Sequence, residues 1–171
     1  MKKLLFLILV FFFIPINSQA IDTNINFFTG PAHLANKFDD SWTLGVGVDF
    51  MLTDSMALSL KANYIETNRT ISPGLLRLVP IEADLKYIFN PYGQVCPYLA
   101  GGINVNILSS TYSTPTIGVN LRGGAAYKID RYNIFVEAEK ILMHDNKNDT
   151  DITPFIINFG VGILGAFNLL N

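Results

Sequence analysis

Cysteine, basic charge and cofactor-binding motifs are scarce in this 171-residue chain. The single cysteine, Cys96, excludes an internal disulfide and is expected to be a small apolar residue that is buried or contacts lipid. The formal net charge of −2 gives no basic footprint for nucleic acid. The sequence also lacks the CxxC, HExxH and P-loop patterns that bind metals or nucleotides. We therefore predict no cofactor, no metal site and no nucleic-acid partner.

An uninterrupted apolar run occurs at the amino terminus. Residues 4–14 follow Lys2 and Lys3, and Pro15 ends the run. The small residues Ser18 and Ala20 then suit a signal-peptidase site. A membrane anchor is the alternative, but the run is shorter than the about 20 residues of a spanning helix, and no basic cluster follows it. We predict a signal peptide at 1–20 and a single mature domain at 21–171.

The mature chain alternates between apolar residues and small or polar ones. From Trp42 to Leu52, every second residue is large and apolar, whereas Thr, Gly, Asp and Met lie between them. This period of two is the signal of a β-strand. Clusters of Gly, Pro, Asn, Asp and Ser separate such segments. Eight strands are predicted, at 24–34, 42–52, 56–64, 79–89, 98–107, 117–129, 133–142 and 155–169.

The low charge content decides which kind of β protein this is. Only 15% of the residues are charged and the mean hydropathy is +0.33, which is unlike a soluble sandwich that shows its polar faces to water. The polar faces are rich in Gly, Ala, Ser and Asn, which suits a narrow interior with apolar faces turned to lipid. Lipid forbids an open sheet edge. We therefore predict an all-β fold, an eight-stranded antiparallel up-and-down transmembrane β-barrel.

The predicted connections alternate in length. Tight turns are expected at 53–55, 91–93 and 130–131, and longer polar loops at 31–40, 68–74, 109–115 and 145–153. Short periplasmic turns and long outer loops are typical of outer-membrane barrels, so both termini should lie in the periplasm. Aromatic side chains then form two belts. The periplasmic belt is predicted at Phe50, Tyr87, Phe89, Tyr127, Tyr132 and Phe167, and the outer belt at Trp42, Tyr64 and Phe155.

The segment 155–170 has a competing interpretation, because it is apolar enough to suggest a transmembrane helix. Asn158, Asn168, several glycines and the strict alternation favour a strand instead.

Three segments, 80–87 (PIEADLKY), 97–102 (PYLAGG) and 135–139 (FVEAE), carry a resemblance. They resemble the outer-membrane β-barrel superfamily of Gram-negative bacteria that includes the small porin-like, opacity, OmpA- and OmpW-type barrels. The resemblance covers essentially the whole mature chain and implies fold and location rather than activity. Members usually end in an aromatic residue that the assembly machinery reads. Here either Phe167 serves that role from an inner position, or recognition differs.

The inward faces carry a set of charged side chains. The predicted interior charge network consists of Asp49, Lys61, Glu82, Asp84, Lys86, Arg122, Lys128, Glu137 and Glu139. An ion-selective pore lining is one interpretation. A structural network is favoured, because the signs nearly balance and side chains fill the interior of an eight-stranded barrel. A two-residue turn at 130–131 would place Arg122 opposite Glu139 and Gly124 opposite Glu137, so we predict an Arg122–Glu139 ion pair.

Candidate catalytic residues are few. Small barrels that deacylate lipid A carry a His and a Ser two residues apart, facing the membrane. Here Asn146 follows His144 at that spacing and Ala35 follows His33, so no serine nucleophile has a base within reach. The acidic loop 145–151 lacks the glycine and the spacing of an EF-hand loop. We predict no catalytic residues and no enzymatic activity.

The sequence therefore favours a small integral protein of the cell outer membrane with a polar, side-chain-filled interior and a structural or surface-interaction role. Its expected partners are outer-membrane lipids and the outer-membrane assembly machinery, and the sequence identifies no partner for the outer loops. The alternative is an OmpW-like conduit for small hydrophobic molecules. A conduit needs an apolar tunnel and a lateral exit, and the polar inward faces argue against it. A lipid A-modifying enzyme is the least favoured hypothesis.

Overall fold

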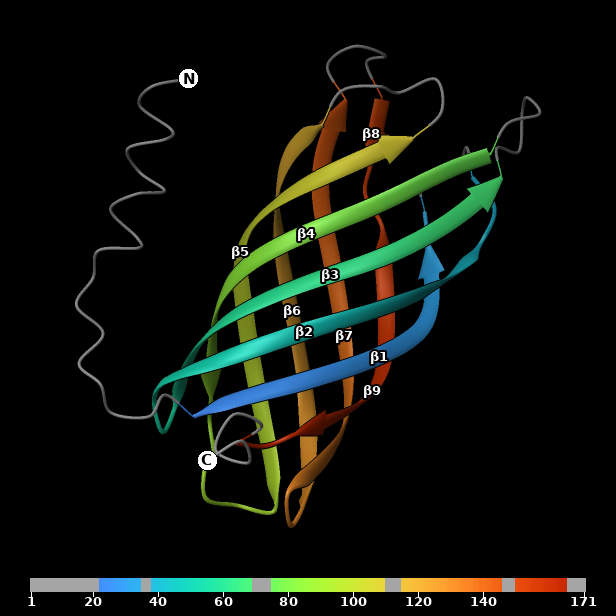
Figure 1. Ribbon diagram of the computed structural model, residues 1–171. Helices are drawn as coiled ribbons and strands as arrows, with labels where there is room; N and C mark the ends of the chain where they lie inside the picture. Colours follow the sequence, from blue (N-terminus) through green and yellow to red (C-terminus); the bar gives the residue numbers. More distant parts are fainter. Residues whose placement is uncertain (1–21, 35–37, 69–74, 110–114, 146–149, 166–171) are drawn as a thin grey trace, which may run out of the picture.

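The computed structural model describes residues 22–34, 38–68, 75–109, 115–145 and 150–165 (Figure 1). The predicted signal peptide and Phe167 lie outside these ranges. The described residues form nine strand segments: β1 (Thr23–His33), β2 (Ser41–Thr53), β3 (Met56–Asn68), β4 (Leu75–Ile88), β5 (Val95–Ser109), β6 (Thr116–Ile129), β7 (Tyr132–Asp145), β8 (Thr150–Ile152) and β9 (Phe155–Ile163).

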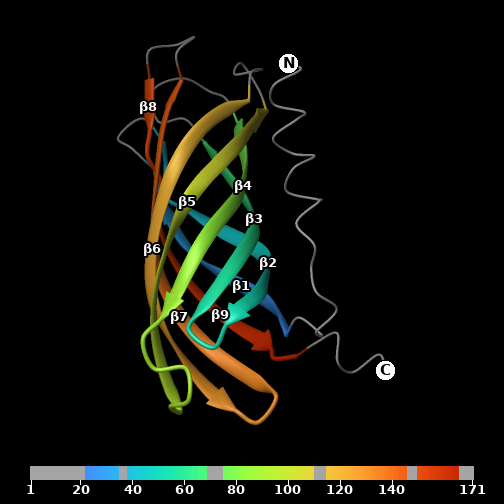
Figure 2. The same cartoon turned by 90° about the vertical axis from the view of Figure 1, so that its left-hand side faces the viewer.

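The strands close into a barrel. Antiparallel pairing runs in the order β6-β5-β4-β3-β2-β1-β9-β7, and pairing of β6 with β7 completes the circle. Figures 1 and 2 show the strands winding obliquely around one interior, with hairpin turns at the lower end. Because β8 and β9 form a single barrel strand, the predicted eight-stranded antiparallel barrel is confirmed.

The eighth barrel strand is interrupted at Thr153 and Pro154. Both β8 and β9 pair with β7 in one continuous register. Pro154 has no N–H to donate, but its carbonyl accepts a hydrogen bond from the Ile141 N–H at 3.0 Å. The choice of a strand over a helix is correct for β9. No helix in the described residues is long and apolar enough to span a membrane.

The predicted turn at 130–131 is confirmed, and so is its register. Ile129 lies opposite Tyr132, and Arg122 lies opposite Glu139. Asp130 has a φ of 50°, as the tight primed turns of hairpins require, and Asp tolerates this conformation better than most residues.

Several predicted loop boundaries are wrong by one to three residues. Thr53 belongs to β2, Pro31 to β1, Asn68 to β3 and Ser109 to β5, and the loop predicted at 145–153 contains β8. Pro31 fits a strand because neither Gly30 nor Pro31 pairs with β9, so the missing N–H of Pro31 costs no ladder bond there. The barrel wall thus extends further toward the long loops than the turn-forming residues suggested.

The outer surface of the barrel is apolar. Outward-facing Leu44 and Ile117 are 68% and 75% exposed, and large apolar side chains from all of the long strands share this exposure. A bilayer is the solvent that suits such a surface. The described aromatic residues of the two predicted belts lie toward the turns and toward the long loops, respectively. Near the turns, the rings of Tyr87 and Phe89 pack edge to face, with their centroids 5.2 Å apart.

Candidate functional site

The barrel interior gathers eight of the nine residues of the predicted charge network. Because strand side chains alternate between faces, each of these residues points inward from its strand. They come from β2, β3, β4, β6 and β7, so the network spans the lumen from wall to wall. These residues are Asp49, Lys61, Glu82, Asp84, Lys86, Arg122, Glu137 and Glu139.

Arg122 is the most highly connected side chain of the network. Its Nε donates to Asp84 at 2.8 Å, its Nη1 to Glu137 at 2.9 Å and its Nη2 to the Ser59 hydroxyl at 2.6 Å. Asp84 lies two strands away, on β4. Arg122 can reach it because the intervening strand β5 places Gly102, which has no side chain, opposite Asp84.

Lys61 joins the two glutamates of β7 from the opposite wall. Its Nζ donates to Glu137 at 2.8 Å and also to Glu139, and it lies 4.7 Å from the centre of the Phe28 ring. The predicted Arg122–Glu139 ion pair is therefore wrong, although the register behind it is right. Arg122 extends diagonally to Glu137 and across β5, while a cation from β3 binds Glu139.

A separate ion pair lies closer to the turns. Lys86 donates to Asp49 at 2.8 Å and lies 4.2 Å from the centre of the Tyr98 ring. The Asn26 amide donates to the same Asp49 oxygen at 3.1 Å. Tyr98 links this pair to the rest of the network, because its hydroxyl donates to Glu137 at 3.0 Å.

Asparagine amides supply donors that the cations do not. Glu82 accepts hydrogen bonds from Asn63 at 2.8 Å and Asn120 at 3.3 Å, and Asn120 also donates to Asp84 at 2.8 Å. Asn158 donates to both glutamates of β7 at 3.4 Å. These asparagines were not predicted as site residues. Their inward strand positions beside carboxylates are the signal that identifies them, because a buried carboxylate needs donors.

Lys128 does not join the network. Its Nζ donates to the Pro91 carbonyl in the turn between β4 and β5, at 2.5 Å. It therefore lies at the turn end of the barrel, where an open vestibule of about 590 Å³ is lined by Asp49, Lys86 and Asn133, among others. Between this vestibule and Arg122, a small cavity of about 20 Å³ has room for about one water molecule. The two spaces share the lining residues Lys86, Tyr98, Ala126 and Asn133, so the vestibule adjoins the network.

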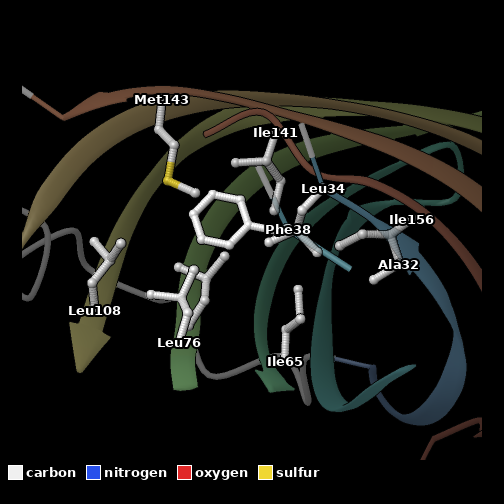
Figure 3. Close-up of a cluster of buried hydrophobic side chains, with 10 residues drawn as sticks. Ala32, Leu34, Phe38, Ile65, Leu76, Leu108, Ile141, Met143 and Ile156 are labelled. Atoms are coloured by element: carbon white, nitrogen blue, oxygen red, sulfur yellow. The ribbon is translucent and has the colours of Figure 1, made fainter. Parts of the chain in front are cut away.

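The half of the interior near the long loops contains an apolar cluster beside buried Thr67 and Asn106, which corrects the expectation of a polar interior. Figure 3 shows a cluster of buried side chains there, with Leu34 and Phe38 from the β1–β2 connection among side chains of the strands. Leu34 is fully buried and Phe38 is 6% exposed. The strand residues of this outer apolar cluster are Ala32, Ile65, Leu76, Leu78, Leu108, Ile141, Met143 and Ile156.

The predicted catalytic alternatives lie at the loop end. His33 Nδ1 lies 2.5 Å from Asp40 Oδ1, and both side chains are exposed. The side chains of His144 and of the acidic loop 145–151 lie outside the described residues. No group of three or more His, Cys, Asp or Glu residues in the described ranges is arranged to hold a metal ion.

Comparison with known proteins identifies the fold. The sequence matches no protein-family model and no curated protein. Among solved structures, Neisserial surface protein A has a TM-score of 0.69 at 14% identity, covering 85% of this chain and 97% of that one.

Two further matches cover similar shares of both chains. The amino-terminal β-barrel domain of Pseudomonas aeruginosa OprF has a TM-score of 0.60 at 16% identity, covering 84% of this chain and 96% of that one. The outer-membrane enzyme PagL has a TM-score of 0.54 at 15% identity, covering 82% and 98%. The chain therefore has the fold of the small eight-stranded outer-membrane β-barrels.

Proposed function

We propose that the protein is an integral outer-membrane barrel whose filled interior serves a structural or surface-interaction role and passes no hydrophilic solute. The observation that supports this most is that two layers of side chains, the ion network and the outer apolar cluster, fill the lumen. Lys61 and Arg122 connect opposite walls through the glutamates of β7, and the outer apolar cluster lies between them and the loops. Its partners on this proposal are outer-membrane lipids and the assembly machinery, with the outer loops available for surface contacts.

A solute-permeation assay tests this role. Liposomes that contain the purified protein should swell in small sugars no faster than liposomes without protein, because the network leaves no continuous aqueous path. A general porin in the same lipid provides the positive control. Swelling that decreases with the size of the sugar would contradict the proposal.

The proposal includes the absence of catalysis. Support comes from the His33–Asp40 pair, which is exposed rather than held beside a buried nucleophile. Incubation of the protein with lipid A should leave its acyl chains intact. Release of fatty acid that depends on His33 or His144 would contradict this part of the proposal.

A conduit for small hydrophobic molecules is the second candidate, and the outer apolar cluster favours it. The cluster contacts the β1–β9 seam through Ala32 and Ile156. Pairing along this seam is interrupted, because no residue of β1 between Thr29 and Ala32 pairs with β9. Within the described residues, β8 pairs only with β7. An apolar molecule that displaced Phe38 would therefore enter an apolar space beside this interrupted seam.

The conduit and the closed barrel make different predictions for Phe38. A conduit gated by Phe38 should take up a fluorescent apolar probe into vesicles faster in the Phe38→Ala variant than in the wild type. Leu142→Ala, which removes an outward-facing side chain from β7, is the matched control. Equal uptake by the wild type, both variants and empty vesicles would exclude the conduit.

A further inference from the structure

The lipid-facing side of the barrel is hollowed over β2 to β5. The hollow has a volume of about 400 Å³ and lies around two small residues, Ala62 and Ala83, on neighbouring strands. Larger apolar side chains surround them. The apolar side chains that border the hollow include Val46, Leu60, Ile81 and Val105. This volume falls in the range of ligand sites, and its lining side chains suit a hydrocarbon chain.

A polar group lies on the same two strands, nearer the long loops. Tyr64 and Glu66 of β3 and Arg77 of β4 all point outward. The Tyr64 hydroxyl donates to Glu66 Oε2 at 2.6 Å, and Arg77 Nε donates to the same oxygen at 2.9 Å. The side chains of Arg77 and Glu66 remain 52% and 42% exposed. Charged groups are costly against hydrocarbon and are placed at the level of lipid headgroups.

The register aligns the polar group with the hollow. Ala62 lies opposite Ile81, and Glu66 lies opposite Arg77, four residues further along each strand. Four residues correspond to about 13 Å of strand. At a strand tilt of about 40°, the polar group lies about 10 Å nearer the long loops than the hollow does, measured along the barrel axis. This separation is close to about 12 Å, which is half the height of the apolar band of an outer-membrane barrel. One lipid can therefore occupy both places.

We propose that this outward face of β3 and β4 is a binding site for one phosphorylated, acylated glycolipid of the outer leaflet. An acyl chain fills the hollow over Ala62 and Ala83, and a phosphate binds the guanidinium of Arg77. Glu66 would repel a bare phosphate, but as a hydrogen-bond acceptor beside the Tyr64 hydroxyl it suits the sugar hydroxyls next to that phosphate. The site lies outside the lumen and does not depend on whether the barrel conducts.

Lipid retention tests the site. The full mature protein is refolded in detergent with purified bisphosphorylated lipid A, phosphatidylglycerol or phosphatidylethanolamine, and the bound lipid is counted by native mass spectrometry. The variants are Ala83→Phe, which fills the hollow, and Arg77→Gln, which removes the charge. The controls are Ala125→Phe, an outward position on β6, and Arg131→Gln in a turn. The gel mobility of unheated samples establishes that each variant is folded.

The wild type should retain lipid A at about tenfold lower concentration than either phospholipid, a difference of about 1.4 kcal/mol. Ala83→Phe and Arg77→Gln should each remove this preference, and the two controls should keep it. Equal retention of all three lipids would overturn the proposal. So would a preference that survives Ala83→Phe, since the acyl chain and the phosphate would then not share one site.

Discussion

At the residue scale, the balance of hydrogen-bond donors and acceptors determines how the side chains of the interior pair. Five carboxylates face three cations, and asparagines of the strands provide further donors. The carboxylates are Asp49, Glu82, Asp84, Glu137 and Glu139, and the cations are Lys61, Lys86 and Arg122. A buried charge that loses its partner is costly because water cannot replace that partner. The network is therefore expected to respond to single changes more strongly than to paired ones.

A double-mutant cycle distinguishes the observed pairing from the one that the register suggested. Arg122→Met should cost about 3–5 kcal/mol of unfolding free energy, because it leaves Asp84 and Glu137 without their guanidinium. Combined with Glu137→Gln, the loss should be less than additive by at least about 1 kcal/mol. Combined with Glu139→Gln, it should be closer to additive. Stronger coupling to Glu139, measured by urea titration in lipid vesicles, would contradict the geometry.

Adjacent glycines of β6 offer a second test. A Cβ at inward-facing Gly124 would meet the Val136 carbonyl and lie 2.8 Å from the Tyr98 hydroxyl, whereas a Cβ at outward-facing Gly123 would have nothing nearer than 3.5 Å. Gly124→Ala should therefore cost about 1–3 kcal/mol. Gly123→Ala should change stability by less than about 1 kcal/mol. Equal effects of the two substitutions would mean that the faces of β6 are assigned wrongly.

The ion pairs were harder to predict than the strand pairs. The pairing of Arg122 with Glu139 across the two strands follows from the alternation of side chains and a two-residue turn, and both can be recognised in the sequence. The partner of Glu139 is Lys61, which comes from the far wall and whose position depends on how the barrel closes. Side chains long enough to cross a narrow lumen choose among several partners, and strand register alone does not decide between them.

At the element scale, each strand is a two-faced ribbon whose outward face needs lipid. The alternation predicted which residues face outward in the middle of the strands. It missed the inward Leu76 and Leu78, because Leu75, Val79 and their neighbours form a nearly continuous apolar run that hides the period. Ile141 and Met143 likewise adjoin a polar loop. The sequence pattern therefore did not predict the outer apolar cluster.

Arginine substitutions measure the lipid exposure of the strands. Leu60 and Val161 are 43% and 50% exposed on the outward face of β3 and β9. Leu60→Arg and Val161→Arg should each cost about 2–4 kcal/mol in vesicle folding titrations, since an arginine near the bilayer midplane is poorly solvated. Ser55→Arg in a turn should cost about 0–1 kcal/mol. Costs near zero at both strand sites would contradict the membrane orientation.

At the scale of the whole molecule, the interior has three layers. A vestibule that admits water lies at the turns, the ion network lies in the middle, and the outer apolar cluster lies beneath the loops. The ion network and the outer apolar cluster each interrupt an aqueous path through the barrel. An eight-stranded barrel has an interior just wide enough for side chains to fill, and here polar and apolar side chains fill it in series.

Single-channel recording in a planar bilayer tests this filled barrel most directly. Wild-type protein should show no stable conductance above the bare bilayer, and neither should a Lys61→Ser/Arg122→Ser variant, because the outer apolar cluster still closes the lumen. A variant that also carries Phe38→Ser and Leu76→Ser should conduct. Reproducible open channels from the purified wild-type protein would contradict the account.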